Sequence, residues 1–363
     1  MSNEKNPSTS DQKLEEAVVK DMILNDYRIM MESREASLLG RREVLTGKAK
    51  FGIFGDGKEL AQLCLAKQFM DGDYRSGYYR DQTIMLALGE VSLQEYYAQL
   101  FSDTNVDNEP HSAGRQMNCH YGTRFINDDG TWKDMTKIKI TTTDLSPTAA
   151  QMPRIMGLGL ASKLFRENKD LNQFSTLSNN GNEIVFGTIG DGSTSEGIFL
   201  EAINAMGVLQ IPVVMSVWDD GHAISVPVEK QTTKGSISEA LKGFAKENGS
   251  NGIEILKARG WNYPELCAVY DKAAKMARED HTPVLVHVIE LTQPQGHSTS
   301  GSHERYKSKN RLNWEKEYDC IVQFKKWIIE NGWANEEELE EVHKNTKRAV
   351  RDANNDAWKN YIT

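Results

Sequence analysis

Short apolar runs alternate with longer amphipathic segments between residues 183 and 291, and this is the clearest pattern in the chain. The segments between the runs predict helices at residues 197–210, 236–245 and 264–280. The runs themselves predict strands at residues 183–189, 212–218, 252–258 and 283–291. Strand–helix–strand repeats of this length are typical of parallel strands joined by right-handed crossovers. The pattern therefore predicts an α/β fold built on a layered, mostly parallel sheet.

Helical periodicity marks both flanks of this region. Apolar residues recur among charged ones at 13–46, and further helices are predicted near 315–331 and 335–360. Asn335 followed by Glu338 is similar to a capping box at the start of the last helix. We expect four parts: a disordered lead at 1–12, an N-terminal helical segment at 13–50, an α/β domain at 51–312 and a C-terminal helical segment at 313–363.

Composition narrows the possible classes of function. Of the 363 residues, 39% are hydrophobic and 26% are charged, the mix of a soluble globular protein. The net charge of −9 argues against a nucleic-acid partner, which would need a concentrated basic face. The longest apolar runs are strand-sized, so we expect no membrane span. Scattered cysteines and the absence of a signal or transit pattern at residues 1–12 predict a cytoplasmic protein with reduced thiols.

Acidic residues follow two of the predicted strands at the point where each strand ends. A Gly-Asp-Gly turn at 190–192 contains Asp191, and an Asp-Asp-Gly turn at 219–221 contains Asp220. In an open parallel sheet, ligands bind beyond the carboxyl ends of the strands. If these strands are neighbours, the two carboxylates come close together and need a cation or a proton between them. Oxygen ligands with room for water and phosphate favour magnesium.

The helix predicted to start near Ser195 supplies the other half of an anion site. Its first turn offers unpaired N–H groups and a partial positive charge of roughly half a unit. Gly190 and Gly192 let the backbone approach an anion closely, so a diphosphate with magnesium is the natural occupant. The alternative is a pair of ordinary strand-to-helix turns, with Asp and Gly present for turn chemistry. Two such motifs at this spacing favour the ligand site.

These two turns resemble the thiamine diphosphate signature. Here GDG is followed by 26 residues and then Asp-Asp, whereas the signature usually closes with Asn-Asn. The resemblance implies that magnesium is bound by Asp191, Asp220 and the backbone carbonyl of His222. It also implies that Gly192 and Ser193 contact the cofactor. Asp220 keeps the oxygen ligand of the signature but adds a negative charge beside the diphosphate.

An earlier block extends the resemblance to the α subunits of 2-oxo acid dehydrogenases. DGDYRSGYYRD, at 71–81, is similar to the segment in which a Tyr-Arg pair of these proteins grips the diphosphate. The resemblance assigns that role to Tyr79 and Arg80. A guanidinium fork is suited to it, because it donates two charge-assisted hydrogen bonds to phosphate. Without the resemblance, such a pair is more often an ordinary surface pair.

Two further blocks look closest to the branched-chain members of this family. They are GRQMNCHYG at 114–122 and LSPTAAQMPRIMGLGLA at 145–161. The resemblance implies a cofactor contact from Ser146 and an apolar wedge two residues later, where this chain has Thr148. A cationic residue that precedes the Asn pair in the family is replaced by Trp218, which removes one expected phosphate contact. The blocks imply the thiamine-diphosphate-binding fold, with helices on both faces of the sheet.

The polar stretch QGHSTSGSHERYKS, at 295–308, resembles the loop that closes over the active site in these enzymes. The family's catalytic histidine maps to His297. A neutral imidazole with a pKa near the working pH orients or relays a proton. A lone loop histidine is otherwise more often exposed and inert, and the matching GHSTS frame favours the catalytic role.

The resemblance implies thiamine diphosphate-dependent oxidative decarboxylation of a 2-oxo acid, with branched-chain substrates preferred. The acyl unit would pass to a lipoyl group on an acyltransferase component. No second α/β domain is recognisable in the sequence, so we expect a β subunit in an α2β2 assembly, or a β domain fused to this chain. A pyruvate or acetoin dehydrogenase α subunit is the alternative within this chemistry. A non-catalytic subunit that binds cofactor or partner is the alternative from another class.

Overall fold

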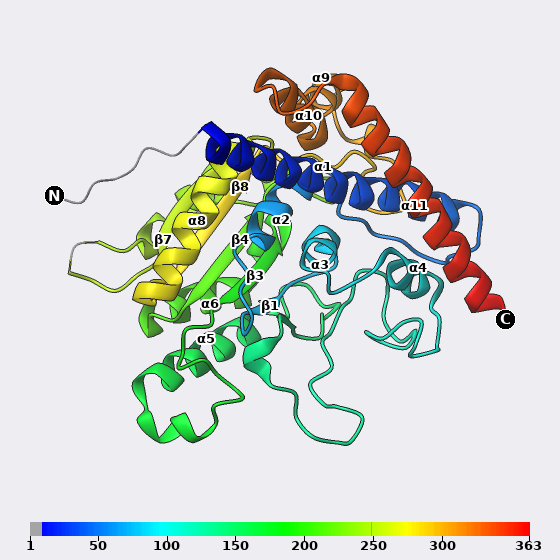
Figure 1. Ribbon diagram of the computed structural model, residues 1–363. Helices are drawn as coiled ribbons and strands as arrows, with labels where there is room; N and C mark the ends of the chain where they lie inside the picture. Colours follow the sequence, from blue (N-terminus) through cyan, green and yellow to red (C-terminus); the bar gives the residue numbers. More distant parts are fainter. Residues whose placement is uncertain (1–8, 248) are drawn as a thin grey trace.

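The computed structural model describes residues 9–247 and 249–363, and a six-stranded sheet forms its centre (Figure 1). The strand order is β2-β1-β3-β4-β8-β7, and every neighbouring pair is parallel. The strands are β1 (Tyr74–Ser76), β2 (Ile140–Thr141), β3 (Val185–Gly190), β4 (Val213–Trp218), β7 (Glu254–Arg259) and β8 (Val284–Ile289). A separate antiparallel pair consists of β5 (His222–Ala223) and β6 (Val226–Pro227). The predicted α/β fold with a mostly parallel sheet is confirmed.

Helices surround this sheet and extend beyond it at both ends of the chain. The longer ones are α1 (Thr9–Leu45), α4 (Leu93–Phe101), α5 (Met152–Glu167), α6 (Gly197–Leu209), α8 (Tyr263–Asp280), α9 (Lys309–Glu317), α10 (Cys320–Glu330) and α11 (Glu336–Ile362). The shorter ones are α2 (Glu59–Ala66), α3 (Gln82–Leu88) and α7 (Ile237–Ala240). In the described part of the chain, no helix combines the length and apolar character needed to cross a bilayer.

Both faces of the central strands β3, β4 and β8 are buried, which explains why these strands are nearly continuous apolar runs. Successive side chains of a strand point to opposite faces. In β4, Val214 and Trp218 belong to the core formed with α2 and α8. Met215 and Val217 belong to the opposite core, formed with α5 and α6. Helices therefore cover both faces, as the resemblance implied.

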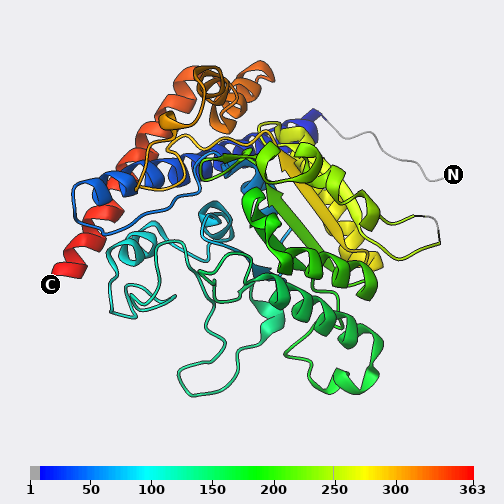
Figure 2. The ribbon, with the colours of Figure 1, turned by 180° about the vertical axis from the view of Figure 1, so that it is seen from behind.

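The terminal helices pack against this body rather than standing apart from it. Ile23 of α1 and Phe324 of α10 lie in the same core as α2 and α8. Figures 1 and 2 show α11 crossing α1, and the two helices are in contact. The predicted capping box at the start of α11 is confirmed, since Asn335 and Glu338 each accept the other's backbone N–H.

Two predicted boundaries differ from the structure at helix ends. Helix α1 begins at Thr9, inside the lead expected to be disordered at 1–12, whose first eight residues lie outside the described part of the chain. The helix predicted at 236–245 is confined to α7 and is followed by a 3₁₀ turn at Lys242–Phe244. Gly243 lies in that turn, where its low helix propensity favours the break.

The helix predicted near 315–331 is two helices. Chain direction changes between α9 and α10, where the Asp319 side chain accepts the N–H of Ile321 and caps α10. Asp319 also pairs with Arg34 of α1 at 2.9 Å. The break between the helices therefore places Asp319 for its ion pair with Arg34, which the hydrophobic periodicity of the sequence does not reveal.

A glycine ahead of β3 offers a test of this packing. Gly181 has a φ of +70°, and a Cβ there would lie 2.4 Å from the Ser162 carbonyl oxygen of α5. Gly130 has a φ of +83°, with no atom within 4 Å of such a Cβ. Gly130→Ala should cost about 1–2 kcal/mol, the penalty of a left-handed conformation alone. Gly181→Ala should cost about 1–3 kcal/mol more, because it also overpacks the site.

Urea denaturation of both variants measures this difference in the free energy of unfolding. Equal losses in the two variants would contradict the close approach of Gly181 to α5.

Candidate active site

The carboxyl ends of β3 and β4 form one edge of a cavity. The two strands are adjacent and parallel, and Gly190 at the end of β3 pairs with Trp218 at the end of β4. Asp191 directly follows β3 and Asp220 lies two residues after β4, and both line a cavity of about 260 Å³. The structure therefore meets the condition on which the predicted site depends, that these two strands are neighbours.

Most of the predicted site residues lie around this one cavity. Its lining includes Tyr79, Arg80, Thr148, Asp191, Gly192, Ser193, Asp220, His222 and His297. Ser146 is not part of that lining. Its hydroxyl lies 3.1 Å from Nε2 of the buried His120 instead. Since His120 Nδ1 is 3.1 Å from the Asn118 carbonyl, which only accepts, Nε2 is the acceptor for Ser146.

The two carboxylates have opposite electrostatic surroundings. Burial, together with the charges of Asp220 and Asp219, raises the pKa of Asp191 well above its usual range. Oδ2 of Asp191 is buried and has no hydrogen-bond partner. Burial also acts to raise the pKa of Asp220, but Lys58 and Lys307 outweigh it and lower that pKa to about 2. Asp220 is thus a stable anion, whereas Asp191 needs a further cation to remain one.

Lys58 is not among the residues predicted from the sequence. Its side chain is 1% exposed, and its Nζ donates to Asp220 Oδ2 at 2.9 Å. Nζ also donates to Gln293 Oε1 at 2.6 Å and to the Thr292 carbonyl at 3.2 Å. Lys58 directly precedes α2, far from the other motifs in sequence. A Gly-Asp-Gly-Lys turn before a helix was the available signal, but its partner 162 residues away is a product of the tertiary fold.

The carboxylate oxygens of Asp191 and Asp220 suit a hard cation that takes several of its ligands from outside the protein side chains. Within the described residues, no group of three or more His, Cys, Asp and Glu side chains is placed to hold a metal. A metal between Asp191 and Asp220 would therefore take its remaining ligands from carbonyl, water or phosphate oxygens. Mg²⁺ is commonly bound in this way, through one or two carboxylates and substrate phosphates. The unpartnered Oδ2 of Asp191 fits such a site.

The chain after β3 differs in detail from the predicted helix start. A 3₁₀ turn occupies Asp191–Ser195, and α6 begins at Gly197 rather than near Ser195. A Cβ on Gly192 would lie 2.5 Å from the Ala223 Cβ of β5. Glycine at 192 is therefore required by packing against the β5 turn, a reason that the sequence did not indicate.

A buried ion network holds the segment that carries Tyr79 and Arg80. The fully buried Arg75 of β1 pairs with Asp81 at 2.7 Å and with Asp144 at 3.1 Å. Asp81 Oδ2 also accepts the Tyr78 N–H at 3.3 Å. A Cβ on Gly77 would lie 1.9 Å from that same oxygen. The turn thus closes tightly around a charged centre, which fixes where Arg80 enters the cavity.

Arg80 connects the cavity wall to the predicted catalytic loop. Nη1 donates to the Phe54 carbonyl at 2.6 Å, and Nη2 donates to the His297 carbonyl at 2.8 Å. Nη2 also lies 3.0 Å from His297 Nδ1. A guanidinium has no acceptor, so Nδ1 accepts and the ring proton lies on Nε2. Burial, with the Arg80 charge, lowers the pKa of His297 to about 4.

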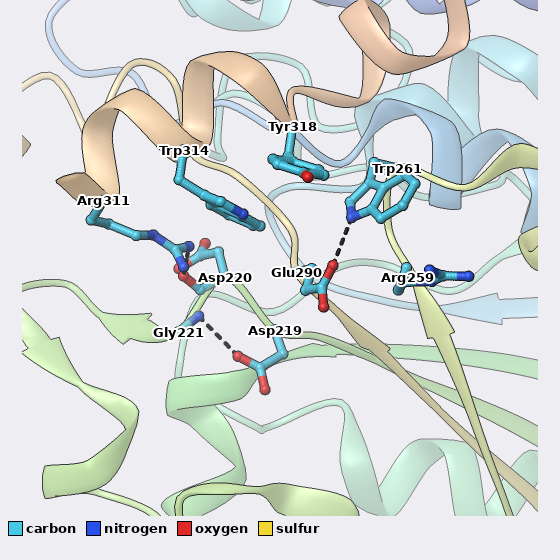
Figure 3. Close-up of a pocket in the computed structure, with 9 residues that line it drawn as sticks. All are labelled: Asp219, Asp220, Gly221, Arg259, Trp261, Glu290, Arg311, Trp314 and Tyr318. Atoms are coloured by element: carbon cyan, nitrogen blue, oxygen red, sulfur yellow. Dashed lines mark hydrogen bonds between the residues drawn. The ribbon is translucent and has the colours of Figure 1, made fainter. Parts of the chain in front are cut away.

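A second, larger cavity of about 610 Å³ is lined by the 219–221 turn together with residues of β7, α9 and the segments that follow β7 and β8 (Figure 3). Its charged groups are engaged: Trp261 donates to Glu290 at 2.7 Å, and the Arg259 guanidinium lies over the Trp261 ring. Figure 3 shows Arg311 of α9 pointing to Asp220, whose carbonyl accepts its Nη2 at 2.8 Å. This contact holds the backbone of the Asp220 turn against α9.

The family model described as "Dehydrogenase E1 component" matches residues 27–362. The chain belongs to this family. Membership implies dependence on thiamine diphosphate. The predicted resemblance to 2-oxo acid dehydrogenase α subunits is thereby confirmed.

The chain is also similar in sequence to individual members of this family. A 2-oxoisovalerate dehydrogenase subunit alpha of Bacillus subtilis is 27% identical over 320 residues, which are 86% of this chain and 83% of that protein. The mitochondrial 2-oxoisovalerate dehydrogenase subunit alpha 1 of Arabidopsis thaliana is 27% identical over 85% of this chain. The match spans only 57% of the plant protein. A pyruvate dehydrogenase E1 component subunit alpha of Rickettsia bellii is 28% identical over 56% of each chain.

The buried environment of His297 predicts its titration. Because its pKa is lowered from 6.5 to about 4, the folded protein should hold the imidazole neutral at pH 5–6. The contribution of this group to stability is complete above pH 6.5 and is lost as the pH falls through about 4. Histidine-detected NMR should show a midpoint near 4 for the resonance that disappears in His297→Asn. A midpoint at or above 6 would contradict the packed loop.

Proposed function

We propose that this chain is the α subunit of the decarboxylating component of a 2-oxo acid dehydrogenase. The reaction releases CO₂ from a 2-oxo acid and passes the acyl unit to a lipoyl group on an acyltransferase component. The observation that carries this proposal is the meeting of Asp191 and Asp220 at adjacent strand ends, in a cavity that also contains Arg80 and His297. Family membership supports the same chemistry.

The residues present would hold Mg²⁺ and the diphosphate of the cofactor. Asp191, Asp220 and the His222 carbonyl would bind the metal, and the lone Oδ2 of Asp191 supports this role. Tyr79, Arg80, Gly192 and Ser193 would face the diphosphate. When bound, thiamine diphosphate supplies the electron sink that decarboxylation of a 2-oxo acid requires. Anchoring its phosphate end by fixed groups orients the distant reactive end.

Within this assignment, His297 holds a proton at Nε2. Arg80 fixes the tautomer through Nδ1, so Nε2–H is the group available to a ligand. A neutral ring with a pKa of about 4 remains a donor throughout the physiological range. His297 therefore orients the reacting carbonyl rather than acting as a strong acid. Thr148, which lines the cavity, would also contact the cofactor. Ser146 would join these contacts only if its hydroxyl left His120.

A β subunit, in an α2β2 assembly or as a fused domain, would close the open side of the cavity. Ile224 lines the cavity although it is apolar and 59% exposed, and it adopts a φ of +58°. An exposed apolar side chain held in a strained turn beside the site is suited to contact with a partner. The lipoyl-bearing component would deliver its arm to the same opening. A cytoplasmic location stays a prediction.

Branched-chain 2-oxo acids are the substrates that we favour. The support comes from the blocks at 114–122 and 145–161 and from the 2-oxoisovalerate dehydrogenase relatives. Pyruvate is the alternative that the Rickettsia relative supports. A reductive acylation assay with 2-oxoisovalerate, pyruvate and acetoin, on the protein assembled with its β partner, distinguishes them. A higher kcat/KM for pyruvate than for 2-oxoisovalerate would reject the branched-chain assignment.

Asp191→Ala tests the metal site. In titration calorimetry of the assembled protein, this change should abolish magnesium-dependent binding of thiamine diphosphate, because it removes one of the two carboxylates that would coordinate the metal. Glu338→Ala, on the exposed start of α11, is the matched control and should leave binding unchanged. Unchanged affinity in Asp191→Ala would reject the metal assignment.

His297→Ala tests the loop. We expect the rate of acyl transfer to fall about 10²–10³-fold, the usual cost of removing one preorganised hydrogen-bond donor from a reacting oxygen. Cofactor affinity should change much less, since the diphosphate ligands remain. A wild-type rate in this variant would remove His297 from the mechanism and would favour a non-catalytic, cofactor-binding role for the loop.

A further inference from the structure

The metal site of this chain contains a third charged group beside its two carboxylates. Lys58 Nζ binds Asp220 Oδ2 at 2.9 Å and lines the same cavity. It is 1% exposed, so solvent does not screen the pair. Among the described residues, Asp220 Oδ1 accepts no hydrogen bond, and Lys58 engages only the other oxygen.

Local packing leaves Lys58 little freedom to move away. Gly57 has a φ of +85°, and a Cβ there would lie 2.1 Å from the Thr292 carbonyl oxygen. This close approach brings the backbone before α2 against the segment that leads to His297. The Lys58 ammonium then reaches the Thr292 carbonyl and the Gln293 side chain. Its three donors thus have three acceptors in fixed positions.

The formal charges of the two carboxylates and the ammonium group partly cancel. Asp191 and Asp220 contribute two negative charges and Lys58 one positive charge, which leaves one negative charge for the three groups. An Asp–Asn pair without a lysine carries the same charge. The aspartate at 220, which adds a charge to the thiamine diphosphate signature, is thus offset by a lysine from a distant part of the chain. At position 218, where the resemblance implies a cation, this chain has Trp218.

We propose that Lys58 is a positioning residue of the metal site. Its ammonium neutralises Asp220 and fixes the rotamer of that side chain, so that Oδ1 binds the divalent cation with the net charge of an amide. Lys58 and Asp220 therefore act as one unit, and neither can be exchanged alone. This inference rests on the proposed function and adds to it a group that the signature lacks.

The pairing of Lys58 with Asp220 predicts an unexpected effect of Asp220→Asn. This substitution makes the turn more similar to the thiamine diphosphate signature, which usually closes with Asn-Asn. This substitution should weaken magnesium-dependent binding of thiamine diphosphate by at least about tenfold, because it leaves a buried ammonium uncompensated beside the metal. Lys58→Met should also weaken cofactor binding, because it adds an uncompensated negative charge beside the diphosphate. With Mn²⁺ alone, Lys58→Met should bind the ion more tightly than the wild type.

The double variant Lys58→Met/Asp220→Asn decides the question. Both charges are removed together, so binding should return to within about threefold of the wild type, and the effects of the two single changes should be strongly non-additive. Calorimetry and Mn²⁺ electron paramagnetic resonance measure binding on the assembled protein, and thermal unfolding reports folding. Lys67→Met is the matched control: Lys67 follows the other end of α2 and pairs with Asp26, so binding should not change.

The outcomes separate the two claims. If the wild type binds no thiamine diphosphate with Mg²⁺, the proposed function fails and this inference fails with it. If the wild type binds and Asp220→Asn binds equally well or better, the role of Lys58 is overturned while the proposed function survives. Additive losses in the double variant would likewise overturn the unit. Should either single variant not fold, the affinity of the double variant remains the deciding measurement.

Discussion

Two carboxylates at the ends of adjacent parallel strands share one buried edge, and the site is organised around that constraint. Asp191 and Asp220 cannot both be ionised there without compensation, because a buried ion loses several kcal/mol of hydration. Lys58 compensates one of them within the chain. The other keeps an oxygen without a partner, and this is the carboxylate to which we assign the external cation in our proposal. The arrangement is thus stable for one carboxylate and poised for a ligand at the other.

Several contacts link the two carboxylates to the loop that carries His297. Lys58 binds the Asp220 side chain and the 292–293 segment at once, and Asp56 accepts the Gln295 N–H at 2.9 Å. Arg80 holds His297 itself from the other wall. Because these contacts converge from α2, β4 and the turn after β1, displacement of one element disturbs the others. Such support keeps reactive groups in position before a ligand arrives.

Buried ion groups at several points serve geometry more than stability. The Arg75 network with Asp81 and Asp144 is fully buried. Replacing such a network by apolar groups is often neutral or stabilising, whereas removing one member is costly. In this protein the network fixes the course of the backbone, because Asp81 also accepts the Tyr78 N–H and so holds the turn that leads to Arg80. Several polar groups thus hold the backbone turns that deliver the cavity lining.

The sequence by itself determined the order of strands and helices from 183 to 291, because burial on both faces gives the central strands β3, β4 and β8 nearly continuous apolar runs. It also placed Asp191 and Asp220 after two consecutive strands, since the turn residues are local in sequence. The tertiary structure decided that these strands are neighbours in the sheet. Only the tertiary structure decided that Lys58 pairs with Asp220, that Ser146 turns to His120, and that Arg80 sets the tautomer of His297. Periodicity reports which face of an element is buried. It carries no information on which polar groups from distant segments meet once the elements pack, and those meetings set the charge of this site.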